Sequence, residues 1–321
     1  MELFDLPHSE SRARLQTGAP VYLPVNPVEY HGPHLPLRND ALISDGLIAD
    51  LHAALQPQHP EWPLLRASHL ELGAEPTAGP GTRHIRPGLL GAQVREACRA
   101  LAELGARRVV LVTFHGAPLH AWALEEGVTL LGGLGVQAYS PLNLVTEKLL
   151  EPGDLGRYAP AYAHIEDPAE REEMLRTLPR DFHAGFFETS VALHYAPRSV
   201  AASYTSLPPC PPVESDAALL GAAKTARRLG RERLALELEL AAYGMGWARI
   251  RPWLGYTGRP HRATAAAGAV FAREMVALFA ARAEEIFAGR ARSPRPILGW
   301  LRAASLGGRI GSTAAVRLEE R

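Results

Sequence analysis

Short apolar runs alternate with longer stretches of helical periodicity along the chain. The runs at 21–25, 62–72, 107–114 and 135–140 predict strands. The run at 107–114 is typical of a strand that is buried on both faces in a parallel sheet. Helical patterns cover residues 42–55, 88–104, 118–131, 168–178, 215–243 and 265–289. This order indicates an α/β chain.

The segment after the first predicted strand is crowded with polar groups that bind metal ions. Asn26-Pro27 ends the strand, and Glu29, His31, His34 and Asp40 follow within twelve positions. Alternate side chains of an extended segment share a face, so Glu29 and His31 point the same way. For Asp40 alone, capping of the helix that begins there is the simpler interpretation. The set of four favours metal binding, because a core histidine needs no neighbouring acid.

A second imidazole follows a second strand. His115 comes directly after the apolar run 107–114. Ligands of open α/β sheets bind beyond the carboxyl ends of strands, so His115 and the segment 29–40 are expected at one edge of the sheet. The Gly- and Pro-rich segment 73–88 places Thr82 and Arg83 on a loop whose backbone can approach a ligand. A solvated surface position explains Arg83 equally well.

The segment 181–190, DFHAGFFETS, is the next polar cluster. Its chemical groups are His183 and Glu188. Read alone, Glu188 is an acid in the first turn of a helix, where it suits the helix dipole. The segment follows three other groups of metal-ligand type in the chain, Glu29, His31 and His115. We therefore interpret His183 as a catalytic imidazole and Glu188 as a metal carboxylate with a part in catalysis.

Composition limits the partners and the compartment. Lys and Arg together number 34, as do Asp and Glu, so the net charge of zero favours neither nucleic acid nor an anionic membrane. A small molecule is the expected partner. Two cysteines cannot form a disulfide framework and suggest a reducing compartment. The first residues lack the features of a signal peptide and no apolar run is long enough to span a membrane, so we expect a cytoplasmic protein.

Three motifs resemble those of the creatininase (creatinine amidohydrolase) family and follow the family's order. They are EYHGPHLP at 29–36 followed by Asp40, HAGFFETS at 183–190, and GYTGRPHRAT at 255–264. The resemblance covers most of residues 20–290. It implies a single domain over 1–290, folded as a three-layer α/β/α sandwich with a mostly parallel central sheet. Insertions are expected near 141–182 and 205–240, and 291–321 is an extension without an assigned role.

The resemblance also implies a metal centre of two divalent ions, zinc or manganese, with iron compatible with the same ligands. Asp40 is the expected bridge. The implied sets are Glu29, Asp40 and His115 for one ion and His31, Asp40 and Glu188 for the other. A metal-activated water would attack a carbonyl, and His183 would pass a proton to the leaving nitrogen. His34, Thr82 and Arg83 are the expected substrate contacts.

One departure from the family pattern concerns the substrate. The family commonly has His-Gly-Gly-Asn where this chain has His115-Gly116-Ala117-Pro118, and creatininase proper has a metal-binding Glu where Ala117 stands. We therefore expect an amidohydrolase that cleaves a C–N bond in a small cyclic or acyl amide other than creatinine, working as a homo-oligomer, commonly a hexamer in this family. Two alternatives stay open: a non-catalytic metal-binding protein, and hydrolysis of a C–C bond in a cyclic ketone.

Overall fold

A parallel sheet forms the middle of the molecule. The computed structural model describes residues 1–150 and 155–307. Within these residues the strands are β1 (Val21–Pro24), β2 (Leu65–Arg66), β3 (Arg108–Val112) and β4 (Gln137–Tyr139). They lie in the order β2-β1-β3-β4 and all pairs are parallel. β1 and β3 pair along their length, from Val21 opposite Val109 to Pro24 opposite Val112, so their carboxyl ends lie side by side.

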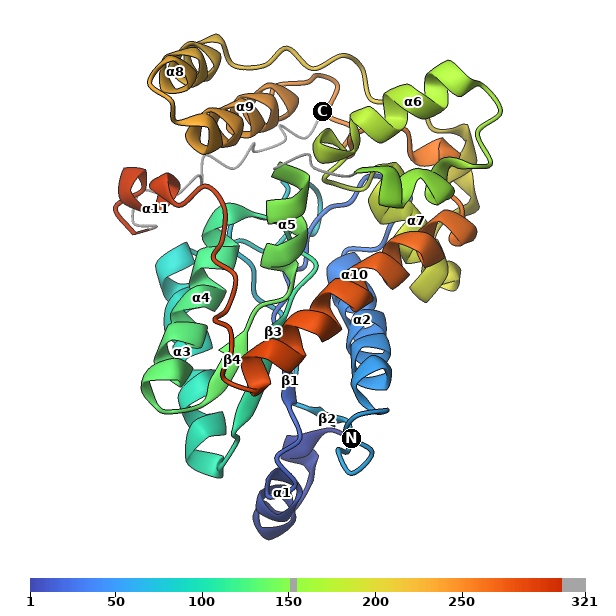
Figure 1. Ribbon diagram of the computed structural model, residues 1–321. Coiled ribbons are helices and arrows are strands. Elements are labelled where there is room, and N and C mark those ends of the chain that lie inside the picture. Colours follow the sequence, from blue (N-terminus) through green and yellow to red (C-terminus); the bar gives the residue numbers. More distant parts are fainter. Residues whose placement is uncertain (151–154, 308–321) are drawn as a thin grey trace.

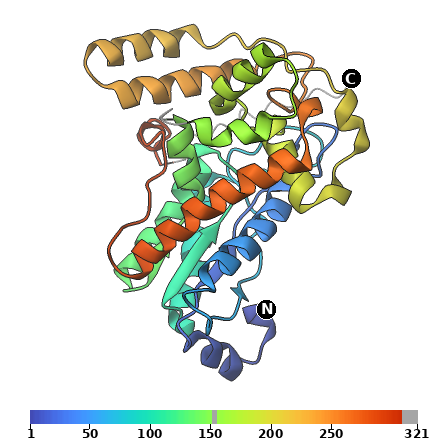
Figure 2. The ribbon, with the colours of Figure 1, turned by 45° about the vertical axis from the view of Figure 1, so that its right-hand side comes forward.

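Helices cover both faces of the sheet (Figure 1). α3 (Pro87–Leu104) and α4 (Pro118–Gly133) pack together on one face, and α2 (Asn39–Leu55) and α10 (Ala265–Phe287) pack together on the other. Figure 2 shows α10 running across the front of the sheet beside α2. The three-layer α/β/α sandwich with a parallel central sheet is therefore confirmed.

The other helices lie around these layers. They are α1 (His8–Leu15), α5 (Leu142–Leu150), α6 (Pro168–Arg176), α7 (Phe186–Tyr195), α8 (Ala217–Arg228), α9 (Glu232–Trp247) and α11 (Trp300–Ala304). Short 3-10 helices span Leu3–Asp5, Leu155–Tyr162, Leu178–Arg180, Pro197–Ser199, Ala202–Ser206 and Pro260–Arg262. None of the described helices combines the length and apolar character needed to cross a membrane.

Two predicted elements differ from those observed. The strand predicted over 62–72 is reduced to β2, because beyond Arg66 the segment returns to the sheet only at an isolated bridge between Leu70 and Val25. The helix predicted over 215–243 is two helices, α8 and α9. Gly230, with φ +70°, reverses the chain between them, because a left-handed residue ends a helix.

The expected insertions and the C-terminal extension carry helices at one end of the molecule. α5, α6 and the α8–α9 pair lie around the end of the sheet where the strands finish (Figure 1). The α8–α9 pair has a small apolar cluster of its own, built from Ala223, Ala226, Ala235 and Leu238. Of the segments expected as insertions or extension, residues 151–154 and 308–321 lie outside the described residues.

Candidate metal centre

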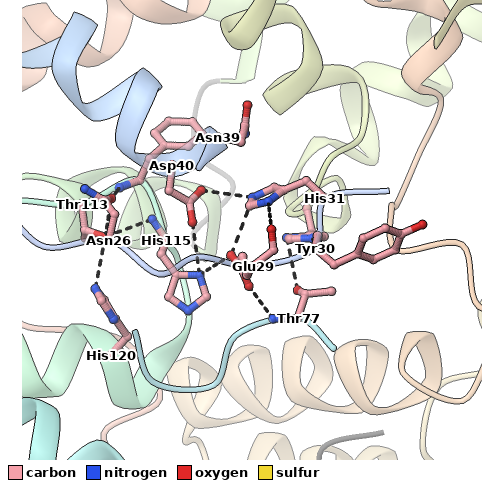
Figure 3. Close-up of polar contacts among 12 residues, drawn as sticks. Asn26, Glu29, Tyr30, His31, Asn39, Asp40, Thr77, Thr113, His115 and His120 are labelled. Carbon is pink, nitrogen blue, oxygen red and sulfur yellow. Dashed lines mark hydrogen bonds and ion pairs between the residues drawn. The ribbon is translucent and has the colours of Figure 1, made fainter. Parts of the chain in front are cut away.

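The turns after β1 and β3 are tied together by one buried amide. The side-chain oxygen Oδ1 of Asn26 accepts hydrogen bonds from the Phe114 backbone N–H (3.0 Å), the Thr113 hydroxyl (3.2 Å) and the Ser44 hydroxyl of α2 (3.0 Å). Figure 3 shows Asn26 between Thr113 and the start of α2. The sequence interpretation gave Asn26 only the role of ending a strand. In the structure it fixes the two strand ends and α2 relative to one another.

Five of the predicted ligands converge beyond these strand ends. Glu29, His31, Asp40, His115 and Glu188 are all buried, with exposures of 0–6%. Nε2 of His31 lies 3.2 Å from Asp40 Oδ1 and 3.2 Å from Glu188 Oε1. Nδ1 of His115 lies 2.8 Å from Glu29 Oε1 and 3.8 Å from Asp40 Oδ2 (Figure 3). The two oxygens of Asp40 therefore face different imidazoles.

The ligand atoms form three overlapping groups, each within 4.8 Å. The groups are Glu29 with Asp40 and His115, His31 with Asp40 and Glu188, and Glu29 with His31 and His183. The first two have the same members as the two sets that the sequence motifs implied, and Asp40 belongs to both.

The hydrogen bonds of the two imidazoles fix which nitrogen faces the carboxylates. Nδ1 of His31 lies 3.0 Å from the Glu29 backbone carbonyl, and Nε2 of His115 lies 2.9 Å from the Ala74 carbonyl. A carbonyl only accepts, so these nitrogens carry the hydrogens, and in a neutral ring the other nitrogen presents a lone pair to the acids. A lone pair facing a carboxylate is stable only with a proton or a metal cation between them.

Without a metal cation, a proton must lie between each of these imidazoles and the carboxylate that it faces. Burial alone would lower the pKa of His115, but the charges of Glu29 and Asp40 and the bond to Glu29 raise this pKa to about 9. In the same way, Asp40 and Glu188 outweigh burial and hold the pKa of His31 well above its ordinary value. Oδ2 of Asp40 is buried and has no hydrogen-bond partner among the described residues. A cation between the groups satisfies that oxygen and both imidazoles at once.

Glu188 is held as a carboxylate. The Asn39 side-chain amide donates to its Oε1 (2.8 Å) and the Ala184 N–H to its Oε2 (2.5 Å). Ala184 has φ +47°, a conformation that residues with side chains rarely adopt and that occurs at functional sites. Burial raises the pKa of Glu188, but His31, His183 and the Ala184 N–H lower it to about 2. Glu188 is thus fitted to hold a cation rather than to carry a proton.

His183 lies against the same cluster. Its ring stacks on His31 with 4.5 Å between ring centres. Its Nε2 lies 2.9 Å from the Tyr30 carbonyl, so Nε2–H donates there and Nδ1 stays a proton acceptor, 3.4 Å from the Thr77 hydroxyl. Burial and the neighbouring His31 lower the pKa of His183. A neutral imidazole with a bare nitrogen beside the ligands is suited to taking up and passing on a proton.

Comparison with known proteins identifies the family. The family model described as creatininase, creatinine amidohydrolase, matches residues 5–283. The chain belongs to the creatininase family. None of the curated proteins matches this chain.

Solved structures of this family share the fold. The structure described as creatininase with Mn is 20% identical, with a TM-score of 0.57, and the match covers 89% of this chain and 99% of that one. A mutant creatininase of Zn-Zn type gives the same values. A putative creatinine amidohydrolase from Bacteroides fragilis NCTC 9343 is 18% identical, with a TM-score of 0.53, over 83% of this chain and 89% of that one.

Asp181, just before the motif at 183–190, and Thr257, inside the motif at 255–264, hold the His183 turn, and the sequence interpretation gave neither a role. Asp181 Oδ2 accepts from the Phe187 N–H at the start of α7 (2.9 Å), and its Oδ1 accepts from the Thr257 hydroxyl (3.2 Å). The Thr257 backbone N–H donates to the His183 carbonyl (2.8 Å). The motif at 255–264 is therefore tied to the segment 181–190. The sequence signal for Thr257 was its place inside a family motif, and for Asp181 its place directly before one.

Another buried histidine, His120, supports His115. The ring of His120, on α4, meets the His115 ring edge to face, and its Nδ1 accepts from the Ala74 N–H at 3.4 Å. Ala74 is the residue whose carbonyl takes the His115 hydrogen. Nearby, Glu75 Oε2 accepts from the Leu119 N–H (2.9 Å) at the start of α4. The Ala117-Pro118 departure from the family pattern thus begins a helix whose first turn is held by Glu75.

The predicted substrate residues of this creatininase-family chain lie outside the three ligand groups. His34 is 1% exposed, with its Nε2 2.8 Å from the Thr189 hydroxyl. The Thr82 hydroxyl accepts from the Tyr30 N–H (2.9 Å) and donates to the Thr77 carbonyl (2.8 Å). The Arg83 side chain is 67% exposed. His34 and Thr82 therefore brace the ligand loops, and contact of any of these residues with substrate stays a prediction.

Proposed function

We propose that this chain is a metal-dependent amidohydrolase that cleaves the C–N bond of a small cyclic or acyl amide. The observation that carries the proposal is the position of Asp40, whose two oxygens face the hydrogen-free nitrogens of two different imidazoles. Three carboxylates and two imidazoles without a thiolate form a ligand set that suits zinc or manganese. We further propose that the protein is cytoplasmic and works as a homo-oligomer.

The ligand residues form two positions for divalent ions. Glu29, Asp40 and His115 would hold one divalent ion, and His31, Asp40 and Glu188 the other. Ions bound there supply Lewis-acid polarisation of a carbonyl and lower the pKa of water. The backbone contacts of His31 and His115 orient the rings, and the donors to Glu188 keep it ionised, so the site is organised before substrate arrives.

His183 is the residue that moves a proton. An amide nitrogen leaves as a strongly basic anion unless it is protonated, and a neutral imidazole beside the ligands can accept a proton and deliver it to that nitrogen. Its Nε2–H is held by the Tyr30 carbonyl. We therefore assign the transfer to Nδ1. The Thr77 hydroxyl, 3.4 Å from this atom, is positioned to orient it.

The substrate is proposed to differ from creatinine, because Ala117 stands where creatininase proper has a ligand. The aromatic surroundings of His183 support an apolar group beside the scissile bond. The Trp247 ring lies 5.5 Å from the His183 ring and 4.7 Å from Trp253, and it also contacts Phe182, which is 37% exposed.

Metal analysis and turnover test the proposal together. We expect protein purified without chelator to contain zinc or manganese, and Asp40→Ala to contain much less. His183→Ala should keep its metal and lose hydrolysis of a panel of small cyclic and acyl amides. Wild-type protein free of divalent ions would remove the basis of the proposal. Metal-loaded wild type that cleaves none of the panel would favour a non-catalytic binding role, to which the altered Ala117-Pro118 turn gives some support.

A further inference from the structure

A cavity unrelated to the metal ligands lies between the C-terminal extension and the helices α4, α5 and α9. Its volume is about 660 Å³. Residues 292–296, 299 and 300 form one wall, and Trp122 of α4 and Arg233 of α9 lie on the others. A second cavity of about 650 Å³ shares Trp122 and Arg295 with it. In Figure 1 the described part of the extension passes α4 and includes α11 at this side of the molecule. The wall from the extension follows residue 283, where the family match ends.

Among the described residues that line the cavity, arginines outnumber acids. The charged ones are Arg233, Arg282, Arg292, Arg295, Glu147 and Glu237. Arg233 contacts both acids, at 3.3 Å from Glu147 and 3.7 Å from Glu237, so it offsets part of their charge. Arg282 contacts Glu285 at 3.5 Å.

Arg292 and Arg295 are the other two arginines of the lining. In the described ranges 1–150 and 155–307, neither Arg292 nor Arg295 makes a side-chain hydrogen bond or an ion pair. A guanidinium carries five N–H donors and no acceptor. The charge of Arg295 also acts on Glu125 in the second cavity, where it opposes the rise of the Glu125 pKa. Both guanidinium groups still have donors for an anion, and the nearby acids limit the excess positive charge to what a monoanion balances.

Two indole rings belong to the same lining. Nε1 of Trp122 and Nε1 of Trp300 are both buried, and neither has a hydrogen-bond partner among the described residues. A buried donor without a partner is costly, so such groups are usually satisfied by water or a ligand. The rings also offer flat apolar faces, although Arg302 lies over the Trp122 ring at 5.5 Å. Arginine donors beside aromatic faces form the chemical complement of a flat molecule with an acidic group.

We propose that this cavity binds a small planar molecule that carries a carboxylate. The carboxylate lies against Arg292 and Arg295, and the ring lies against Trp122 and Trp300. The site is separate from the metal centre and does not depend on the proposed hydrolysis. Arg292, Arg295 and Trp300 belong to the extension 291–321, to which the sequence analysis assigned no role.

The test uses 2-naphthoate as probe and its neutral isostere, 2-naphthamide, as the matched comparison. Binding to the full chain is measured by calorimetric titration. We expect saturable binding of naphthoate and at least about tenfold weaker binding of naphthamide, because hydrogen bonds to charged groups contribute about that much or more. The double variant Arg292→Gln with Arg295→Gln should bind naphthoate at least about tenfold more weakly than wild type.

Control variants separate this site from general attraction to a basic surface. Arg290→Gln removes a charge that is exposed, two residues from Arg292, and outside the lining, so it should leave naphthoate affinity unchanged. Trp300→Ala removes a flat ring of the lining, and it should weaken naphthoate binding. Circular dichroism verifies that each variant is folded. Absence of saturable binding, equal affinity for the two probes, or unchanged affinity in the double variant would overturn the proposal.

Discussion

Replacing Asp40 by Asn should change stability in opposite directions with and without metal ions. In the ion-free protein, burial first, and then the charges of Glu29 and Glu188, raise the pKa of Asp40 from 3.8 to about 7, although His31 opposes them. A raised pKa in the folded state favours the protonated form. The stability that this proton provides is complete below about pH 4 and is lost as the pH rises through 7.

The magnitude follows from the size of the shift. About three pKa units correspond to roughly 4 kcal/mol, the cost of ionising Asp40 in the ion-free folded protein at pH 8. Asn has nearly the same shape and no charge, so it avoids this cost. The pKa of about 7 already includes the opposing attraction of His31, so we expect the variant to gain about 2–4 kcal/mol in chelator. With divalent ions at a thousand times their Kd, wild type should gain about 4 kcal/mol, which the variant forgoes.

Urea unfolding at pH 8 measures both effects. Free energies of unfolding are compared in EDTA and in excess zinc or manganese. The variant should be the more stable protein in EDTA and the less stable one with metal. Asp50→Asn, at an exposed position on the same helix, is the control and should gain from metal as wild type does. If Asp40→Asn is less stable than wild type in EDTA and gains equally from metal, the bridging role is wrong.

Three further outcomes follow from the structure. Gly268→Ala should destabilise the protein by roughly 1–3 kcal/mol in urea unfolding, because the new Cβ would lie 1.9 Å from a backbone oxygen of α7; Gly221→Ala, which has open space around it, should instead be neutral or stabilising. Burial raises the pKa of Glu125 to about 7, so wild type should lose stability relative to Glu125→Gln as pH rises from about 4.5 through 7, and a constant difference between the two would contradict this. Thr257→Val removes the hydroxyl that donates to Asp181 and accepts from the His183 N–H, so turnover should fall about 10- to 100-fold while the metal content stays the same; equal loss of metal would show a general collapse of the site.

Local sequence patterns determined the elements and most of the ligand types. The apolar runs located β1 and β3, and the motifs at 29–36 and 183–190 pointed to the creatininase family. The break at Gly230 was missed because helical periodicity continues on both sides of it, whereas the reversal depends on one left-handed residue. β2 was predicted too long because strand length depends on pairing: β2 pairs with β1 only at Val21 and Tyr22, and the segment meets the sheet again only at the bridge between Leu70 and Val25.

Only the tertiary structure decided which atoms meet and in which protonation state. Asn39 reaches Glu188 across 149 residues, and Asn26 reaches Phe114 across 88. Such pairings arise from the order of the parallel strands and from the packing of α7 against α2, which no local pattern encodes. The hydrogens on His31 and His115 are likewise set by carbonyls that folding brings to them. The sequence by itself therefore determined the chemical types of the ligands, while the packing of distant segments decided their geometry, because a contact across a sheet edge depends on the whole arrangement of layers.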